Sequence, residues 1–140
     1  MACGGRLHHI GFVVPSIADA VAQFCSGMPL SWDGQVFHDP VQTVRVTFLA
    51  HRTPEEPLIE LVEPADRESR VAGFLKRGGG LHHLCYEVPA LEPEVEKSLA
   101  SGAILVADPA TAVAFQGRRI AWICTPGRLL IEYLERDRPS

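Results

Sequence analysis

The chain has 140 residues, of which 46% are hydrophobic and 21% charged. This length and composition are typical of one compact domain and exclude a disordered tail. With 13 basic and 17 acidic side chains, the formal net charge is −4, so nucleic acid is excluded as an expected partner. No window approaches the roughly 20 apolar residues of a membrane helix, and we expect no membrane association.

The first half of the chain shows a strand, a helix and three further strands. The first strand, from Leu7, ends at Val14 because Pro15 cannot continue a central ladder. A short amphipathic helix follows, with Ser16 as its N-cap and Gly27 at its end. Further strands are predicted over 32–38, 43–50 and 57–63.

The second half of the chain repeats the first. The segment Leu7-His8-His9-Ile10-Gly11-Phe12-Val13-Val14-Pro15 matches Leu81-His82-His83-Leu84-Cys85-Tyr86-Glu87-Val88-Pro89 at an offset of 74 positions. Leu58-Ile59-Glu60 likewise matches Leu130-Ile131-Glu132 at an offset of 72. A helix from Leu91 to Gly102 is expected next, and the later strands are predicted over 104–107, 119–124 and 129–135.

These patterns predict an α+β fold built from two βαβββ modules. We expect a single domain over 1–140, with modules 7–64 and 81–136 joined by a segment over 65–80. Within that segment, Ser69 to Arg77 has helical spacing, and the three glycines after it predict a flexible joint.

The cysteines are Cys3, Cys25, Cys85 and Cys124, and no two of them form a Cys-x-x-Cys pair. This spacing excludes a zinc knuckle and a thioredoxin-like motif. We interpret them as free thiols in a reducing compartment, so the expected location is the cytoplasm.

Alternation along the two repeated strands separates their adjacent histidines. His9 and His83 lie on the smaller, more polar face and are the candidate ligands. His8 and His82 lie on the opposite face and are expected to be half-buried neighbours.

Two glutamates occupy equivalent positions on the last strand of each module. Glu60 and Glu132 alternate with apolar residues, and a buried carboxylate requires a cation or an ion-pair partner. Either glutamate alone could instead face water on an edge strand. The repetition favours a joint site, in which each module supplies one imidazole and one carboxylate. Such donors suit one divalent ion, Co²⁺, Ni²⁺, Mn²⁺, Zn²⁺ or Fe²⁺, with positions left open for substrate.

Together these residues resemble the vicinal oxygen chelate superfamily, which includes glyoxalases, bleomycin-resistance proteins and dioxygenases. Within it the chain looks most like the methylmalonyl-CoA epimerases, through Ile59-Glu60-Leu61-Val62-Glu63-Pro64, Gly79-Gly80-Leu81-His82-His83 and Leu130-Ile131-Glu132. The resemblance implies two curled mixed sheets that form a cleft around one metal. It places the metal on His9, Glu60, His83 and Glu132, and it also implies a small-molecule substrate, such as an acyl-CoA, and a homodimer.

The resemblance also implies the proton-transfer residues, and here the chain departs from the family. Glu132 inherits the role of the metal-ligand carboxylate that takes part in proton transfer. The family's second base is a glutamate before the third strand, where this chain has Val41. Asp39, or else His38, is the nearest replacement, so the expected catalytic pair is Glu132 and Asp39.

Two further loops bear on the substrate. Gln116, Arg118 and Arg119 precede a strand and could meet a phosphate, a thioester arm or a carboxylate, or could form a solvated loop. The compact turn at Pro126-Gly127 replaces a longer turn of the epimerases and is common in other members of the superfamily, including glyoxalase I and metal-free binding relatives.

The function expected from these features is a metal-dependent isomerase or epimerase of a small acyl-CoA thioester, acting through a metal-stabilised enolate. One alternative is a glyoxalase-I-like lyase or an iron-dependent dioxygenase, the latter disfavoured because one carboxylate would suffice there. Another alternative is a binding protein without catalysis, which the two His-Glu pairs disfavour.

Overall fold

The computed structural model describes residues 5–136, which form two compact units. Cys3 therefore lies outside the described residues. The N-terminal unit comprises residues 9–82, and the C-terminal unit comprises residues 83–136 together with residues 5–8. In chain order the elements are β1 (Arg6–Val13), α1 (Ile17–Gly27), β2 (Ser31–Trp32), β3 (Phe37–Asp39), β4 (Val44–Ala50), β5 (Leu58–Pro64), α2 (Ala72–Lys76), β6 (Gly80–Val88), α3 (Leu91–Ala100), β7 (Ile104–Thr111), η1 (Val113–Phe115), β8 (Arg119–Cys124) and β9 (Leu130–Glu135). This order confirms the α+β class and the repeated βαβββ pattern.

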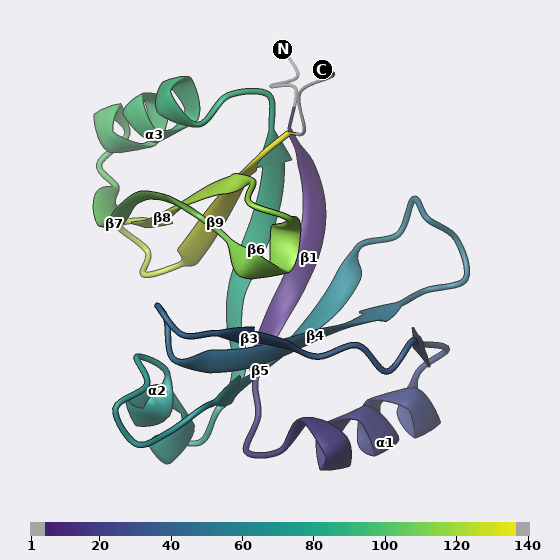
Figure 1. Ribbon diagram of the computed structural model, residues 1–140. Coiled ribbons are helices and arrows are strands. Elements are labelled where there is room, and N and C mark those ends of the chain that lie inside the picture. The colour runs from purple at the N-terminus through teal and green to yellow at the C-terminus, as the bar shows by residue number, and fades with distance from the viewer. Residues whose placement is uncertain (1–4, 137–140) are drawn as a thin grey trace. The chain divides into compact units, whose positions relative to one another are not determined.

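The N-terminal unit is a mixed sheet with α1 packed on one face (Figure 1). Its strand order is β2-β4-β5-β1, with β3 paired to β4. The pair β1–β5 is parallel and the pair β4–β5 is antiparallel. Ser16 caps α1 as predicted, since its hydroxyl accepts a hydrogen bond from the Asp19 N–H at 3.3 Å.

The strand predicted over 32–38 is two short strands, β2 and β3, separated by exposed residues 33–36. The Asp33 carboxylate accepts a hydrogen bond from the Gln35 N–H at 2.9 Å. Gly34, between them, adopts a φ of 85°. An aspartate side chain and a glycine thus form a local turn that interrupts the ladder.

The C-terminal unit repeats this arrangement with the strand order β6-β9-β8-β7. The pair β6–β9 is parallel, and β8 is antiparallel to both of its neighbours. The helix α3 packs on this sheet through a cluster of Val88, Leu91, Val95 and Ala121 (Figure 1). β7 extends to Thr111, past the predicted end at 107, and its pairing with β8 has two register shifts, of which the one between Ala107 and Ala110 accommodates Pro109 in this edge strand.

A carboxylate at the end of the last strand holds the start of the helix in each unit. Glu63 accepts a hydrogen bond from the Ile17 N–H at 3.1 Å and pairs with Arg45. The N–H donor of a first helical turn has no partner within the helix, so each such bond stabilises the helix start.

The C-terminal unit repeats this contact at the equivalent positions. Glu135 accepts a hydrogen bond from the Leu91 N–H at 3.1 Å, and it pairs with Arg119 at 2.9 Å. The duplication therefore preserves the contact that fixes helix to sheet, as well as the strands themselves.

The segment between the modules contains α2, which is shorter than the helix predicted over 69–77. The glycines after it end the helix: the Gly79 N–H donates to the Phe74 carbonyl at 3.0 Å. Gly79 has a φ of 66°, and a Cβ atom there would lie 2.9 Å from the Val13 carbonyl oxygen. Glycine is therefore required at this position for both conformation and space.

Two remaining expectations concern cysteines and the membrane. Cys25, Cys85 and Cys124 form no disulfide within the described residues. Among residues 5–136, no helix has the length and apolar character needed to cross a bilayer.

Candidate active site

The N-terminal unit brings together the predicted ligands His9 and Glu60. His9, on β1, is fully buried, and Glu60, on β5, is 6% exposed. The Glu60 Oε1 atom lies 3.6 Å from the His9 Nε2 atom. The Phe48 ring, on β4, packs edge-on against the His9 ring with centroids 5.6 Å apart. The buried pair therefore presents one nitrogen and one oxygen side by side.

The C-terminal unit brings together His83 and Glu132 in the same way. His83 is 4% exposed and Glu132 is 3% exposed. The His83 Nε2 atom lies 3.6 Å from Glu132 Oε1, the same separation as in the other unit. Trp122 packs edge-on against His83 with ring centroids 4.7 Å apart. Phe48 and Trp122 are 74 positions apart, so the repeat itself is the signal by which these supporting aromatic residues could have been found.

Burial raises the pKa of Glu132 above the ordinary value of a carboxyl group. The nearby His83 ring, a hydrogen bond from the Cys85 thiol and the His8 ring each act to lower it. Cys85 is directly opposite Glu132 in the β6–β9 register and is itself fully buried. Residue patterns alone do not reveal this thiol–carboxylate contact, because it depends on the register of two distant strands.

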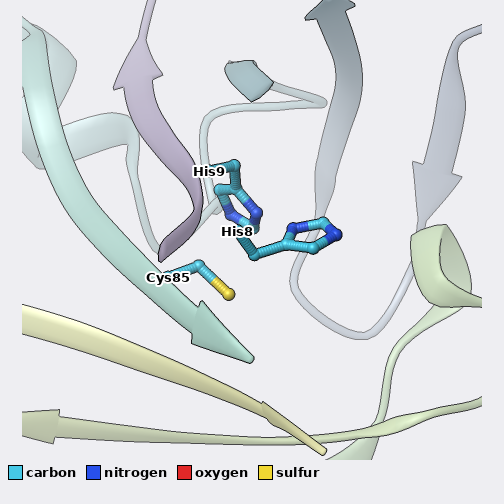
Figure 2. Close-up of side chains that lie close together, drawn as sticks. All are labelled: His8, His9 and Cys85. Carbon is cyan, nitrogen blue, oxygen red and sulfur yellow. The ribbon is translucent and has the colours of Figure 1, made fainter. Parts of the chain in front are cut away.

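His8 and His82 are half-buried, as predicted, and both pack edge-on against a phenylalanine. The His8 ring lies 5.5 Å from the Phe115 ring, and the His82 ring lies 4.9 Å from the Phe74 ring. Figure 2 shows the His8 side chain close to the Cys85 thiol. The two neighbouring imidazoles pack against different aromatic rings, His8 against Phe115 and His9 against Phe48.

Asp39, the predicted second catalytic residue, lies at the end of β3 and is 8% exposed. Its carboxylate accepts hydrogen bonds from the Val41 N–H at 2.9 Å and the Gln42 N–H at 3.1 Å. The Gln42 side-chain amide also donates to Asp39, at 3.2 Å. Val41, at the position of the family glutamate, is 77% exposed, and His38 is exposed as well. Asp39 therefore has a structural role in this turn, and its catalytic role remains a prediction.

Arg118 and Arg119 are engaged in ion pairs with carboxylates. Arg118 donates to Glu87 at 2.7 Å, and Arg119 donates to both Glu92 and Glu135. Burial alone would raise the pKa of Glu87, but Arg118 and other nearby cations hold it below its ordinary value. Both arginines therefore bind the protein's own acids, and a contact of either one with a substrate phosphate, thioester arm or carboxylate remains a prediction.

The donor set in each unit suits a divalent metal ion. Imidazole nitrogen and carboxylate oxygen are the ligands expected for Co²⁺, Ni²⁺, Mn²⁺, Fe²⁺ or Zn²⁺. A separation of 3.6 Å allows one ion to contact both atoms at ordinary ligand distances of about 2.0–2.2 Å. A carboxylate that burial disfavours as an anion is also stabilised by a nearby cation.

Comparison with known proteins places the chain in a family. Residues 8–122 match the model of the Glyoxalase/Bleomycin resistance protein/Dioxygenase superfamily. The chain belongs to this superfamily, which confirms the resemblance inferred from the repeated histidines and glutamates.

Named relatives are epimerases. The chain is 29% identical over 121 residues to the ethylmalonyl-CoA/methylmalonyl-CoA epimerase of Cereibacter sphaeroides, covering 85% of this chain and 87% of that protein. Among solved structures, a methylmalonyl-CoA epimerase from Mycobacterium tuberculosis is similar with a TM-score of 0.80 and 27% identity, covering 94% of this chain and 88% of that one. A hypothetical protein from Bacillus halodurans is similar with a TM-score of 0.82 and 29% identity, covering 97% of both chains.

Proposed function

We propose that this protein is a divalent-metal-dependent epimerase of a small acyl-CoA thioester of the methylmalonyl-CoA type. The observation that carries the proposal is the same buried His–Glu pair, at the same 3.6 Å separation, in both units of a duplicated chain. Similarity to methylmalonyl-CoA epimerases supports the choice of substrate class.

We propose that His9, Glu60, His83 and Glu132 together hold one divalent cation. When bound, such a cation supplies positive charge that stabilises an enolate formed from the thioester. Phe48 and Trp122 restrict the histidine rings from the side, so each Nε2 stays directed at its carboxylate. Both rings and both acids are buried, which excludes bulk water from the proton-transfer step.

Epimerisation requires removal of a proton from one face of the α-carbon and delivery of a proton to the other face. We assign the first transfer to Glu132, because burial raises the pKa of its carboxyl group above the ordinary value, which makes the carboxylate a stronger base. The Cys85 thiol, which donates to this carboxylate, fixes its orientation. For the opposite face we retain Asp39, which would have to release the turn of residues 41 and 42 to act.

The location and assembly of the protein are also part of the proposal. Cys25, Cys85 and Cys124 are not joined in disulfides, which fits a reducing cytoplasm. A homodimer is the expected assembly, since β7 is an edge strand with exposed Ile104 and Val106 that a second copy can cover.

The direct test is solvent exchange at the α-carbon. The purified protein is loaded with Co²⁺ and incubated with one epimer of methylmalonyl-CoA in deuterated water, and both deuterium uptake and epimer ratio are followed. We expect exchange that stops when a chelator removes the metal and resumes when Co²⁺ is restored. Absence of exchange in protein shown to contain the metal would overturn the proposal.

A second candidate function is a glyoxalase-I-like lyase, favoured by the turn between β8 and β9. This turn is compact: the Arg128 N–H donates to the Thr125 carbonyl at 2.9 Å, and the Leu129 N–H donates to the Thr125 hydroxyl at 3.0 Å. The same metal preparations are assayed with the glutathione–methylglyoxal adduct. Turnover of this adduct without exchange on methylmalonyl-CoA would establish the lyase instead. Protein that retains its fold but no metal after dialysis, and is inactive in both assays, would indicate a binding protein.

A further inference from the structure

The C-terminal unit contains a cavity of about 360 Å³ between α3 and the sheet. Its walls include Tyr86, Ile123, Ile131 and Tyr133 from the strands and Ser98 from α3. Along β9, Ile131 and Tyr133 alternate with Glu132, so the cavity and the candidate metal ligand lie on opposite faces of this strand. The cavity is therefore separate from the candidate active site.

The N-terminal unit has an aromatic ring at the place where the C-terminal unit has this cavity. The offset of 74 positions aligns Ser98 with Phe24 and Tyr86 with Phe12. Phe24 packs edge-on against Phe12 with ring centroids 5.3 Å apart, and both rings pack against the core of their unit. At the equivalent position the C-terminal unit has a serine, so it retains the aromatic wall but lacks the ring that packs against it.

The polar groups of the cavity wall also indicate which kind of ligand the cavity suits. The Ser98 Oγ and Tyr133 Oη atoms lie 2.6 Å apart and share a hydrogen bond. One hydroxyl donates to the other, so the pair retains a second hydrogen and free lone pairs for a further hydroxyl group. The two charged wall residues, Glu94 and Lys97, have opposite signs. This combination favours a neutral ligand over an anion or a cation.

We propose that this cavity binds a small neutral molecule that consists of one aromatic ring and one hydroxyl group, of which phenol is the simplest. The ring takes the place that Phe24 fills in the other unit and packs against Tyr86. The hydroxyl joins the Ser98–Tyr133 pair. An apolar cavity of about 150 Å³ can hold benzene, so 360 Å³ accommodates a substituted ring.

The first experiment is a titration of the full chain with phenol, followed by calorimetry and two-dimensional NMR. We expect saturable binding to one site, with the largest chemical-shift changes at Tyr86, Ser98 and Tyr133. Toluene, which has the ring without the hydroxyl, should bind about fivefold more weakly because one hydrogen bond is lost. Benzoate, an anion of similar size, should not bind at this site.

Variants then locate the binding. Ser98→Phe places in the cavity the ring that the N-terminal unit carries, and it should abolish phenol binding while preserving the thermal transition. Ser26→Phe, on an exposed position of α1, is the matched control and should leave phenol binding unchanged. Tyr133→Phe removes one hydroxyl of the pair, and it should weaken phenol binding about fivefold without affecting toluene.

Each alternative outcome contradicts the proposal. Non-saturable binding, or shift changes confined to other residues, would show that the cavity takes no such ligand. Unchanged phenol binding in Ser98→Phe would place the ligand elsewhere. If that variant does not fold, the shift map of the unmodified protein and the Tyr133→Phe titration decide the question, and equal affinity for phenol and toluene overturns the assigned role of the hydroxyl pair.

Discussion

The two units of the chain hold their His–Glu pairs in the same way but surround them differently. Both pairs have a separation of 3.6 Å, and an aromatic ring packs against each histidine. The position opposite Glu60 on the neighbouring strand is Gly11, whereas the position opposite Glu132 is Cys85. The duplicated backbone therefore fixes the donor atoms, while the adjacent residue makes the two carboxylates chemically unequal. Of the two glutamates, the proposal assigns proton transfer only to Glu132.

The largest expected effect is a difference in exchange activity between variants of Glu132 and Glu60. Glu132→Gln removes a ligand charge and the proposed base, so exchange at the α-carbon should fall at least about 100-fold and stay low at any Co²⁺ concentration. Glu60→Gln removes only a ligand charge, so excess Co²⁺ should restore most of the exchange. The measurement is the exchange rate as a function of Co²⁺ concentration. Equal recovery of both variants would contradict separate roles.

The second prediction compares the carboxylates that hold the helix starts. Glu135→Ala leaves the buried Leu91 N–H without its acceptor and should lower the free energy of unfolding by about 2 kcal/mol. Glu63→Ala should cost about 1 kcal/mol, since Ile17 loses one bond and the Arg45 pair is partly exposed. Urea titrations of the metal-free protein give both values. A larger loss for Glu63→Ala would reverse this ranking.

The third prediction removes the thiol opposite Glu132, since Glu60 has no thiol opposite it on its parallel neighbour. The Cys85 hydrogen bond opposes the effect of burial on Glu132, so Cys85→Ala should raise the pKa of that carboxyl group further. Metal binding requires the ionised carboxylate, so Co²⁺ affinity in the variant should begin to fall at a higher pH than in the unmodified protein. Calorimetric titrations across a pH series measure this shift. Cys85→Ser, which retains a donor, is the matched control and should behave like the unmodified protein.

The smallest effect concerns Glu87, whose pKa is held below its ordinary value of 4.5 against the effect of burial, chiefly by Arg118. Because the folded-state pKa is the lower one, the carboxylate stabilises the fold above pH 4.5, and this contribution is lost as the pH falls through the folded-state pKa. Glu87→Gln should therefore cost about 0.5–1 kcal/mol at neutral pH. The difference from the unmodified protein should shrink at acidic pH. A difference independent of pH would indicate lost packing instead of lost charge.

Much of the fold could be predicted from the sequence because its signals are local or repeated. Ser16 caps α1 as expected, and the ends of β8 and β9 lie within a residue of their predicted bounds. The exceptions have tertiary causes. The separation of β2 from β3 depends on the hydrogen bond from the Gln35 N–H to the Asp33 carboxylate. The length of β7 depends on the register shifts in its pairing with β8.

The sequence predicted which histidine and glutamate lie together in each unit of the candidate site. Alternation selected His9 and His83 over their neighbours, and the repeat selected Glu60 and Glu132. The bond from Cys85 to Glu132 was not predictable, since it requires the register between strands almost 50 residues apart in the chain. The turn role of Asp39 was likewise missed, because the backbone conformation of residues 41 and 42 brings the two N–H donors to its carboxylate.

Gly79 has a consequence for how such a chain can diverge. After a gene segment is doubled, the stretch between the copies is ordinarily the part most free to gain, lose or exchange residues. Here any side chain at position 79 would collide with the carbonyl group at the end of the first strand. The junction is therefore under stronger steric selection than an ordinary spacer, and random mutagenesis of this stretch should recover folded clones in which residue 79 remains glycine.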